Sequence, residues 1–112
     1  MAHARRYFEE VADGSKKAQE AMAIIGGLYA VEKRLRETTP TLTTEKIKHH
    51  RQVYSKPILH EFKKWLDHTL ISVSQAGGLA RAIKYSLNNW QVLNRYIEDG
   101  ASILITIQLN RR

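Results

Sequence analysis

Apolar residues recur at every third or fourth position along most of the chain, the spacing that places them on one face of a helix. The first such face covers residues 7–11, and Asp13-Gly14 follows as a stop signal. The second covers residues 18–35, with Ser15 as the expected N-cap because its hydroxyl can accept a hydrogen bond from a free first-turn amide. The pattern predicts a short helix and then a long one, and Gly26-Gly27 within the long helix predicts close approach of a neighbouring helix.

A third apolar face keeps one register over residues 47–70. Thr43 is the expected cap of this helix, and Leu42 and Ile47 occupy the two positions of a hydrophobic staple. Because the register continues through Pro57, the sequence favours one long helix kinked at the proline over two helices joined by a loop.

A fourth face covers residues 79–97 and precedes Gly100, which stands where a glycine cap ends a helix. We expect the aromatic residues Tyr7, Tyr54 and Trp90 to pack in the core. Residues 103–109 differ from the rest, since they form a β-prone and uncharged run. The prediction is one all-α domain of about four helices over residues 1–100, with its two long helices antiparallel, and a non-helical or strand-like tail over residues 101–112.

The composition is that of a soluble globular domain, because 43% of the 112 residues are hydrophobic and 26% are charged. This excludes a disordered chain, and no apolar run approaches the ~18 residues of a membrane span. Acidic residues stand near the start, where a signal peptide would be apolar. The absence of cysteine excludes disulfides and thiol catalysis and fits a reducing compartment. We therefore expect a cytoplasmic protein with no membrane partner.

Positive charge is concentrated in one stretch of the chain. The net charge is +7, and residues 44–64 hold six Lys and Arg against two Asp and Glu, with three histidines in addition. Such a cluster suits a polyanion such as DNA, and a solvated helix face of a basic protein explains it equally well. The candidate DNA-contacting residues, in this stretch and elsewhere, are Arg5, Arg6, Lys46, His49, His50, Lys56, Lys63, Lys64, Arg81 and Lys84.

The histidines do not form a convincing metal site. His49 and His50 are adjacent and point about 100° apart on a helix, whereas His60 and His68 lie two turns apart, so neither pair is placed to share an ion. His60-Glu61 begins like the helix of a zinc protease, but Lys64 stands where that motif needs its second histidine. We expect no metal, no cofactor, no small-molecule substrate and no independent enzyme activity.

Four segments, taken in their order along the chain, resemble a known family. They are AHARRYF at residues 2–8, IIGGLYAVE at residues 24–32, the stretch from Arg51 through Ser55-Lys56-Pro57 to Trp65-Leu66, and AIKYSLNNW at residues 82–90 continued to Asp99-Gly100. In this order they resemble the helical segments of the IS66 group of insertion-sequence transposases. The likeness covers residues 2–100 and rests on several motifs together.

The resemblance implies a DDE transposase, in which three carboxylates on an RNase-H-like sheet hold two divalent ions for strand cleavage and joining. In that family two of the aspartates precede the AHARR segment, and the glutamate follows Asp-Gly within an Asp-Asn-Asn-x-x-Glu motif. Residues 101–110 of this chain contain no acidic residue. No catalytic residue of the family can therefore be carried over to this chain.

The resemblance predicts a truncated transposase fragment that is catalytically inactive and retains weak, sequence-independent DNA binding. One codon spelling of residues 103–109 reads, two bases later, as Pro-Asp-Asn-Asn-Thr-Ile, so we hypothesise that a frameshift near residue 101 produced the tail. The alternative function is a helical module for protein interaction or self-association, such as a homo-oligomer, with no role on nucleic acid.

Overall fold

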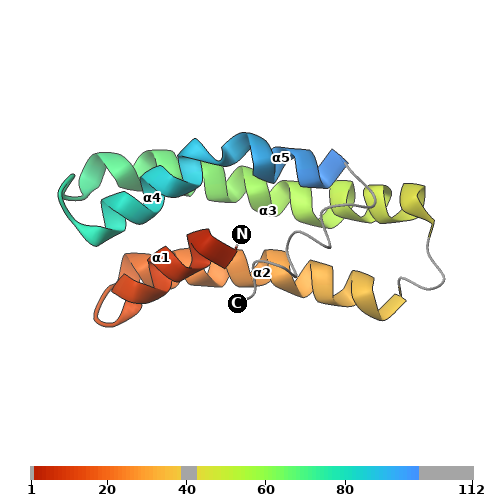
Figure 1. Cartoon of the computed structure of the whole chain (residues 1–112), viewed down its shortest axis with the longest axis horizontal. Coiled ribbons are helices and arrows are strands. Elements are labelled where there is room, and N and C mark those ends of the chain that lie inside the picture. The colour runs from red at the N-terminus through yellow and green to blue at the C-terminus, as the bar shows by residue number, and fades with distance from the viewer. Residues whose placement is uncertain (1, 39–42, 99–112) are drawn as a thin grey trace.

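Two helical hairpins packed against each other make up the described part of the molecule. The computed structural model describes residues 2–38 and 43–98. The first hairpin consists of α1 (Ala2–Ala12) and α2 (Lys16–Thr38); in the second, α3 (Thr44–Ser72) is followed by α4 (Gly78–Asn88) and α5 (Trp90–Glu98), which return along it (Figure 1). This arrangement confirms the predicted all-α class and the antiparallel pair of long helices.

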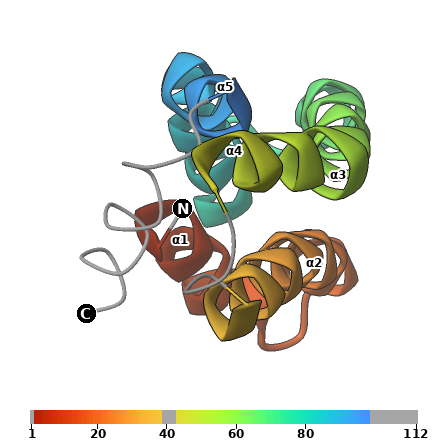
Figure 2. The ribbon, with the colours of Figure 1, turned by 90° about the vertical axis from the view of Figure 1, so that its right-hand side faces the viewer.

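Seen end-on, α1, α2, α3 and α4 enclose a common centre, and α5 continues from α4 along α3 (Figure 2). The centre is filled by side chains that are fully removed from solvent, one or two from each of the first four helices: Phe8, Ile25, Phe62, Leu66 and Ile83. The predicted tail over residues 101–112 and the Leu42 half of the predicted staple lie outside the described residues.

Local chemistry sets the starts of the two long helices as predicted. The Ser15 hydroxyl accepts a hydrogen bond from the Ala18 amide at 3.2 Å, and the Thr43 hydroxyl accepts one from the Lys46 amide at 3.2 Å. Between α1 and α2, Gly14 has a φ of +78°, a left-handed conformation that glycine adopts without a steric penalty. The starts of the two long helices can therefore be predicted from the sequence.

The predicted last helix is divided into two at Asn89. The Asn89 side-chain amide donates a hydrogen bond to the Tyr85 carbonyl oxygen at 2.8 Å, and the Asn89 carbonyl oxygen accepts from the Val92 amide at 3.1 Å. Asparagine side chains compete in this way with regular helical bonding. Directly after the break, Trp90 packs on Phe62, with ring centroids 5.9 Å apart.

The predicted close approach at the glycine pair is wrong for Gly26, where an added Cβ would meet nothing within 4 Å. At Gly27 an added Cβ would make an ordinary contact of 3.5 Å with Ile58. A much closer approach occurs at Gly78, where the Cβ would lie 2.6 Å from Val11 Cγ1. The first turn of α4 therefore packs directly on α1.

Candidate nucleic-acid interface

α3 is a single helix of 29 residues that continues through Pro57, as the apolar register predicted. Its continuity determines how the basic side chains are arranged, because residues at steps of three and four share one face. One such series is exposed or largely exposed along its whole length and lies opposite the buried face of the helix. We call this series the α3 ridge, and it consists of Lys46, His49, Val53, Lys56, His60 and Lys64.

The α3 ridge carries three lysines and two histidines and contains no acidic residue. From Lys46 to Lys64 it extends about 27 Å at the rise of an α-helix. A DNA strand places a phosphate about every 3.4 Å along the duplex axis, so the length of the ridge equals about eight phosphate spacings. Glu61 flanks the ridge on one side, and Asp67 follows Lys64.

Other predicted basic residues are not part of this series. Lys63 of α3 forms an ion pair with Asp67 at 2.7 Å, and Arg5 of α1 forms one with Glu9 at 3.0 Å. The Arg5 guanidinium also lies over the Tyr29 ring, 5.3 Å from its centroid. Because a neighbouring carboxylate offsets each charge, Lys63 and Arg5 offer less attraction to phosphate than the ridge lysines do. Arg6 is exposed on α1, away from α3 in sequence.

His50 lies at the edge of the α3 ridge and contacts Tyr54, with ring centroids 4.5 Å apart. Partial burial lowers the pKa of His50, and Arg34 and His49 lower it further, although Glu32 acts in the opposite direction. His50 therefore gives little positive charge to the surface at neutral pH.

The prediction that Tyr54 packs in the core is wrong, because 53% of the residue is exposed. The buried face of α3 includes Arg51 and Ser55. Tyr54 precedes Ser55 by one position, which turns it about 100° around the helix from that buried residue.

Arg51 belongs to the basic stretch but does not lie at the surface. Its side chain is fully buried and donates two hydrogen bonds to the Glu32 carboxylate, from Nε at 3.1 Å and from Nη2 at 2.8 Å. The partner of Arg51 was not predicted from sequence, because the two residues belong to different helices and no local pattern links them. The basic stretch thus presents less charge at the surface than its composition indicates.

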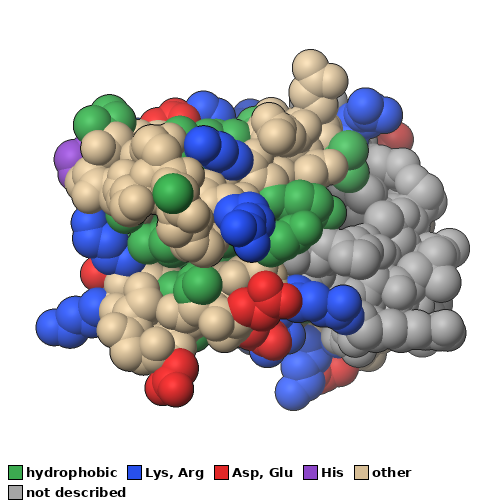
Figure 3. Space-filling model, turned by 60° about the vertical axis from the view of Figure 1, so that its left-hand side comes forward, with side chains coloured by type: hydrophobic (Ala, Val, Ile, Leu, Met, Phe, Trp, Pro, Cys, Tyr) green, Lys and Arg blue, Asp and Glu red, His purple; other side chains and the backbone are tan. Residues whose placement is uncertain are grey.

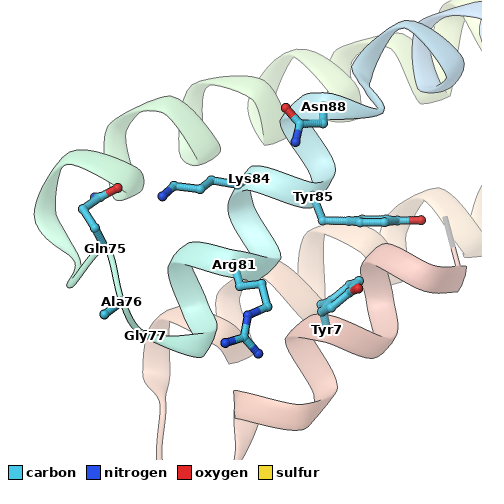
Figure 4. A pocket seen from close by; sticks show the side chains of 8 residues that line it. All are labelled: Tyr7, Gln75, Ala76, Gly77, Arg81, Lys84, Tyr85 and Asn88. Carbon is cyan, nitrogen blue, oxygen red and sulfur yellow. The ribbon is translucent and has the colours of Figure 1, made fainter.

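Arg81 and Lys84 lie on α4 and form a second basic site. They line a shallow hollow with a volume of about 360 Å³, whose walls include Tyr7, Gln75, Arg81, Lys84, Tyr85 and Asn88. Figure 4 shows Lys84 extending toward Gln75, and the Tyr7 and Tyr85 rings beside one another. The centroids of these two rings are 4.7 Å apart. We call this site the α4 hollow.

Two features of these surfaces were absent from the sequence prediction. His60 was not among the candidates, although its spacing of four residues from both Lys56 and Lys64 places it on their face. The α4 hollow could not be predicted from local spacing, because it needs α1 to pack against α4.

Neither a cluster of metal-ligating side chains nor a helix able to cross a membrane occurs among the described residues. Across residues 2–38 and 43–98, no three His, Asp or Glu side chains gather as a metal ion would require. Within the same ranges, none of the helices combines the length and the apolar character that crossing a bilayer demands.

A helical bundle with a long basic helix face is an arrangement that can bind DNA. Comparison with known families identifies the class of protein to which the chain belongs. The family model described as the transposase IS66 family matches residues 1–105. The chain belongs to the IS66 family of transposases.

Two similar proteins are known from Sinorhizobium fredii (strain NBRC 101917 / NGR234). The uncharacterized protein y4jD is 34% identical over 102 residues, which cover 89% of this chain and 19% of the relative. The uncharacterized protein y4hP is 27% identical over 113 residues, which cover 88% of this chain and 20% of the relative. The chain therefore spans about a fifth of the length of these relatives. No solved structure matches the chain significantly.

Proposed function

We propose that this segment is a helical DNA-contacting module of an IS66-family transposase, and that it binds the duplex backbone without reading its sequence. Family membership supports DNA as the partner. The observation that carries the proposal is the α3 ridge, where the continuity of one helix aligns Lys46, Lys56 and Lys64 on a single exposed face.

The chemistry of the ridge explains why binding should not depend on base sequence. A lysine ammonium is a compact point charge on a flexible stem, so it neutralises a phosphate but carries little information about the bases. Each phosphate neutralised on a duplex contributes about −0.9 to the slope of log K against log salt, so three ridge lysines give a slope of about −2.7. Raising the salt from about 50 to about 200 mM should then weaken binding roughly 40-fold.

Titration of fluorescently labelled duplexes tests this proposal directly. Two duplexes of unrelated sequence should bind with equal affinity, and their anisotropy curves should shift with salt as given above. Absence of binding at low salt, or an affinity that ignores salt, would contradict the proposal. Either result would favour a helical interaction module. Analytical ultracentrifugation would then show whether the chain associates with itself.

We further infer that the chain by itself does not cleave DNA. The family chemistry needs a cluster of carboxylates to hold its divalent ions. Residues 101–110, where the family likeness places the glutamate, contain no acidic residue. The pure chain should leave supercoiled plasmid intact in magnesium or manganese. Nicking by the pure chain, absent from a mock preparation, would show this inference wrong.

A further inference from the structure

The α4 hollow has the size and composition of a ligand site. Its volume of about 360 Å³ lies within the range of small-molecule pockets, roughly 300–1,000 Å³. Three parts of the chain build it: Tyr7 from α1, Gln75 from the turn after α3, and Arg81, Lys84 and Tyr85 from α4. The close packing of Gly78 on Val11 holds the first turn of α4 against α1 and so keeps these parts together.

The charge in the hollow favours an anion. No carboxylate lines it, and neither Arg81 nor Lys84 forms an ion pair with any residue in the described ranges. Gly77, which also lines the hollow, is the N-cap of α4 and makes no side-chain cap bond, so the positive end of the helix dipole opens there. Figure 3, which brings the left-hand side of Figure 1 forward, shows Lys and Arg side chains beside hydrophobic ones, with Asp and Glu side chains below them.

The uncharged groups of the hollow favour a planar ring. Tyr7 and Tyr85 are half-buried, and their rings pack against each other with centroids 4.7 Å apart and planes tilted by 40°. The Gln75 side-chain nitrogen donates to the Leu70 carbonyl oxygen at 3.0 Å, which fixes the amide. Asn88, three residues after Tyr85 on α4, has an exposed side chain that also lines the hollow. Aromatic faces stack with bases, and amides can pair with base edges.

We propose that the α4 hollow binds one unpaired nucleotide of a single DNA strand. Arg81 and Lys84 contact its phosphate, and its base stacks on the Tyr7–Tyr85 ring pair. The nucleotide must be unpaired, because the faces of bases within a duplex are covered by their neighbours and a hollow of this size cannot admit a duplex. This inference rests on the proposed function only in taking DNA as the ligand, since the α3 ridge and the α4 hollow are separate surfaces.

Two charge-neutralising double variants separate the hollow from the ridge. The hollow variant is Arg81→Gln with Lys84→Gln, and the matched ridge variant is Lys56→Gln with Lys64→Gln. Each is titrated with a short single-stranded oligonucleotide and with a duplex of the same sequence. The hollow variant should bind the single strand about tenfold more weakly, with a salt slope reduced by about 1.4, and should keep its affinity for the duplex. The ridge variant should lose duplex affinity.

The inference is overturned if the hollow variant binds the single strand as tightly as the unmodified chain, or if both double variants weaken single-strand binding equally. The proposed function fails on a different result, namely unchanged duplex affinity in the ridge variant.

Tyr85 tests the base-stacking part of the inference without changing charge. Tyr85→Leu should weaken single-strand binding about tenfold and leave the salt slope unchanged, whereas Tyr85→Phe should retain the affinity because the ring remains. Tyr54→Leu, at the exposed edge of the ridge, is the matched control and should have no effect on single-strand binding. Circular dichroism establishes that the variants are folded. If Tyr85→Leu binds like the unmodified chain, the assignment of a nucleotide is overturned.

Discussion

Arg51 of α3 and Glu32 of α2 form a bidentate ion pair in the interior of the molecule, with each residue no more than 1% exposed. The planar guanidinium matches the carboxylate in geometry, so the pair specifies one position of α3 along α2. The same register brings Leu28 of α2 near Leu59 of α3. The pair thereby joins the two hairpins. It holds α3 in place through its buried face, which lies opposite the α3 ridge.

Breaking this pair on one side should destabilise the fold strongly. In Glu32→Leu, Arg51 is left as a buried charge without its carboxylate, and the free energy of unfolding should fall by about 3–5 kcal/mol. The double variant Glu32→Leu with Arg51→Met should recover most of this loss, because no buried charge remains. Urea unfolding measures both. A double variant as unstable as the single one would contradict the account.

Substitution by alanine should change the stability of the fold in opposite directions at Gly26 of α2 and at Gly78 of α4. At Gly26 an added Cβ meets nothing within 4 Å, so Gly26→Ala should stabilise the helix by about 1 kcal/mol. At Gly78 the Cβ would lie 2.6 Å from Val11 Cγ1, so Gly78→Ala should cost about 1–3 kcal/mol through overpacking.

Thermal unfolding measures these changes, and Val11→Ala in the Gly78→Ala background provides the control. It removes the atom that clashes and should restore part of the lost stability. If Gly78→Ala is as stable as the unmodified chain, then α4 does not approach α1 as closely as described.

His50 should make the fold less stable as the pH falls. Its pKa is lowered below the ordinary value of 6.5, chiefly by burial, so between the two values the folded chain binds fewer protons than the unfolded chain. Stability therefore rises with pH in this window, and the loss develops as the pH falls through about 6.5 toward the lowered value.

The measurement is the urea midpoint of the unmodified chain and of His50→Gln between about pH 7.5 and pH 5. His50→Gln should lose less stability than the unmodified chain over this range. Parallel curves for His50→Gln and the unmodified chain would exclude this role for His50.

Local sequence features predicted most of the fold. Ser15 and Thr43 cap their helices through bonds to amides three residues ahead, which any reader of the sequence can propose. The division at Asn89 was not predicted, because the apolar stripe passes through it unchanged and asparagine occurs both inside helices and at their ends.

The candidate site was predictable in its charge but only partly in its geometry. The cluster of cations was evident from composition. The alignment of Lys46 with Lys64, in contrast, depended on whether α3 continues as one helix through Pro57. The burial of Arg51 depended on Glu32, and the hollow depended on the meeting of Tyr7 with Tyr85. These are contacts between helices, and spacing within one helix does not specify them.

Two charge reversals of equal size distinguish contact at the α3 ridge from a general attraction to DNA. The ridge reversal variant carries Lys56→Glu and Lys64→Glu, and the control carries Lys16→Glu and Lys33→Glu, which replace two exposed lysines of α2. Both change the net charge equally, so a general attraction to DNA would weaken equally in the two. We expect the ridge reversal variant to bind duplex DNA far more weakly, with its salt slope reduced by about 1.8, while the control keeps the slope of the unmodified chain. Equal losses of affinity and slope in the two variants would contradict the claim that the α3 ridge contacts DNA.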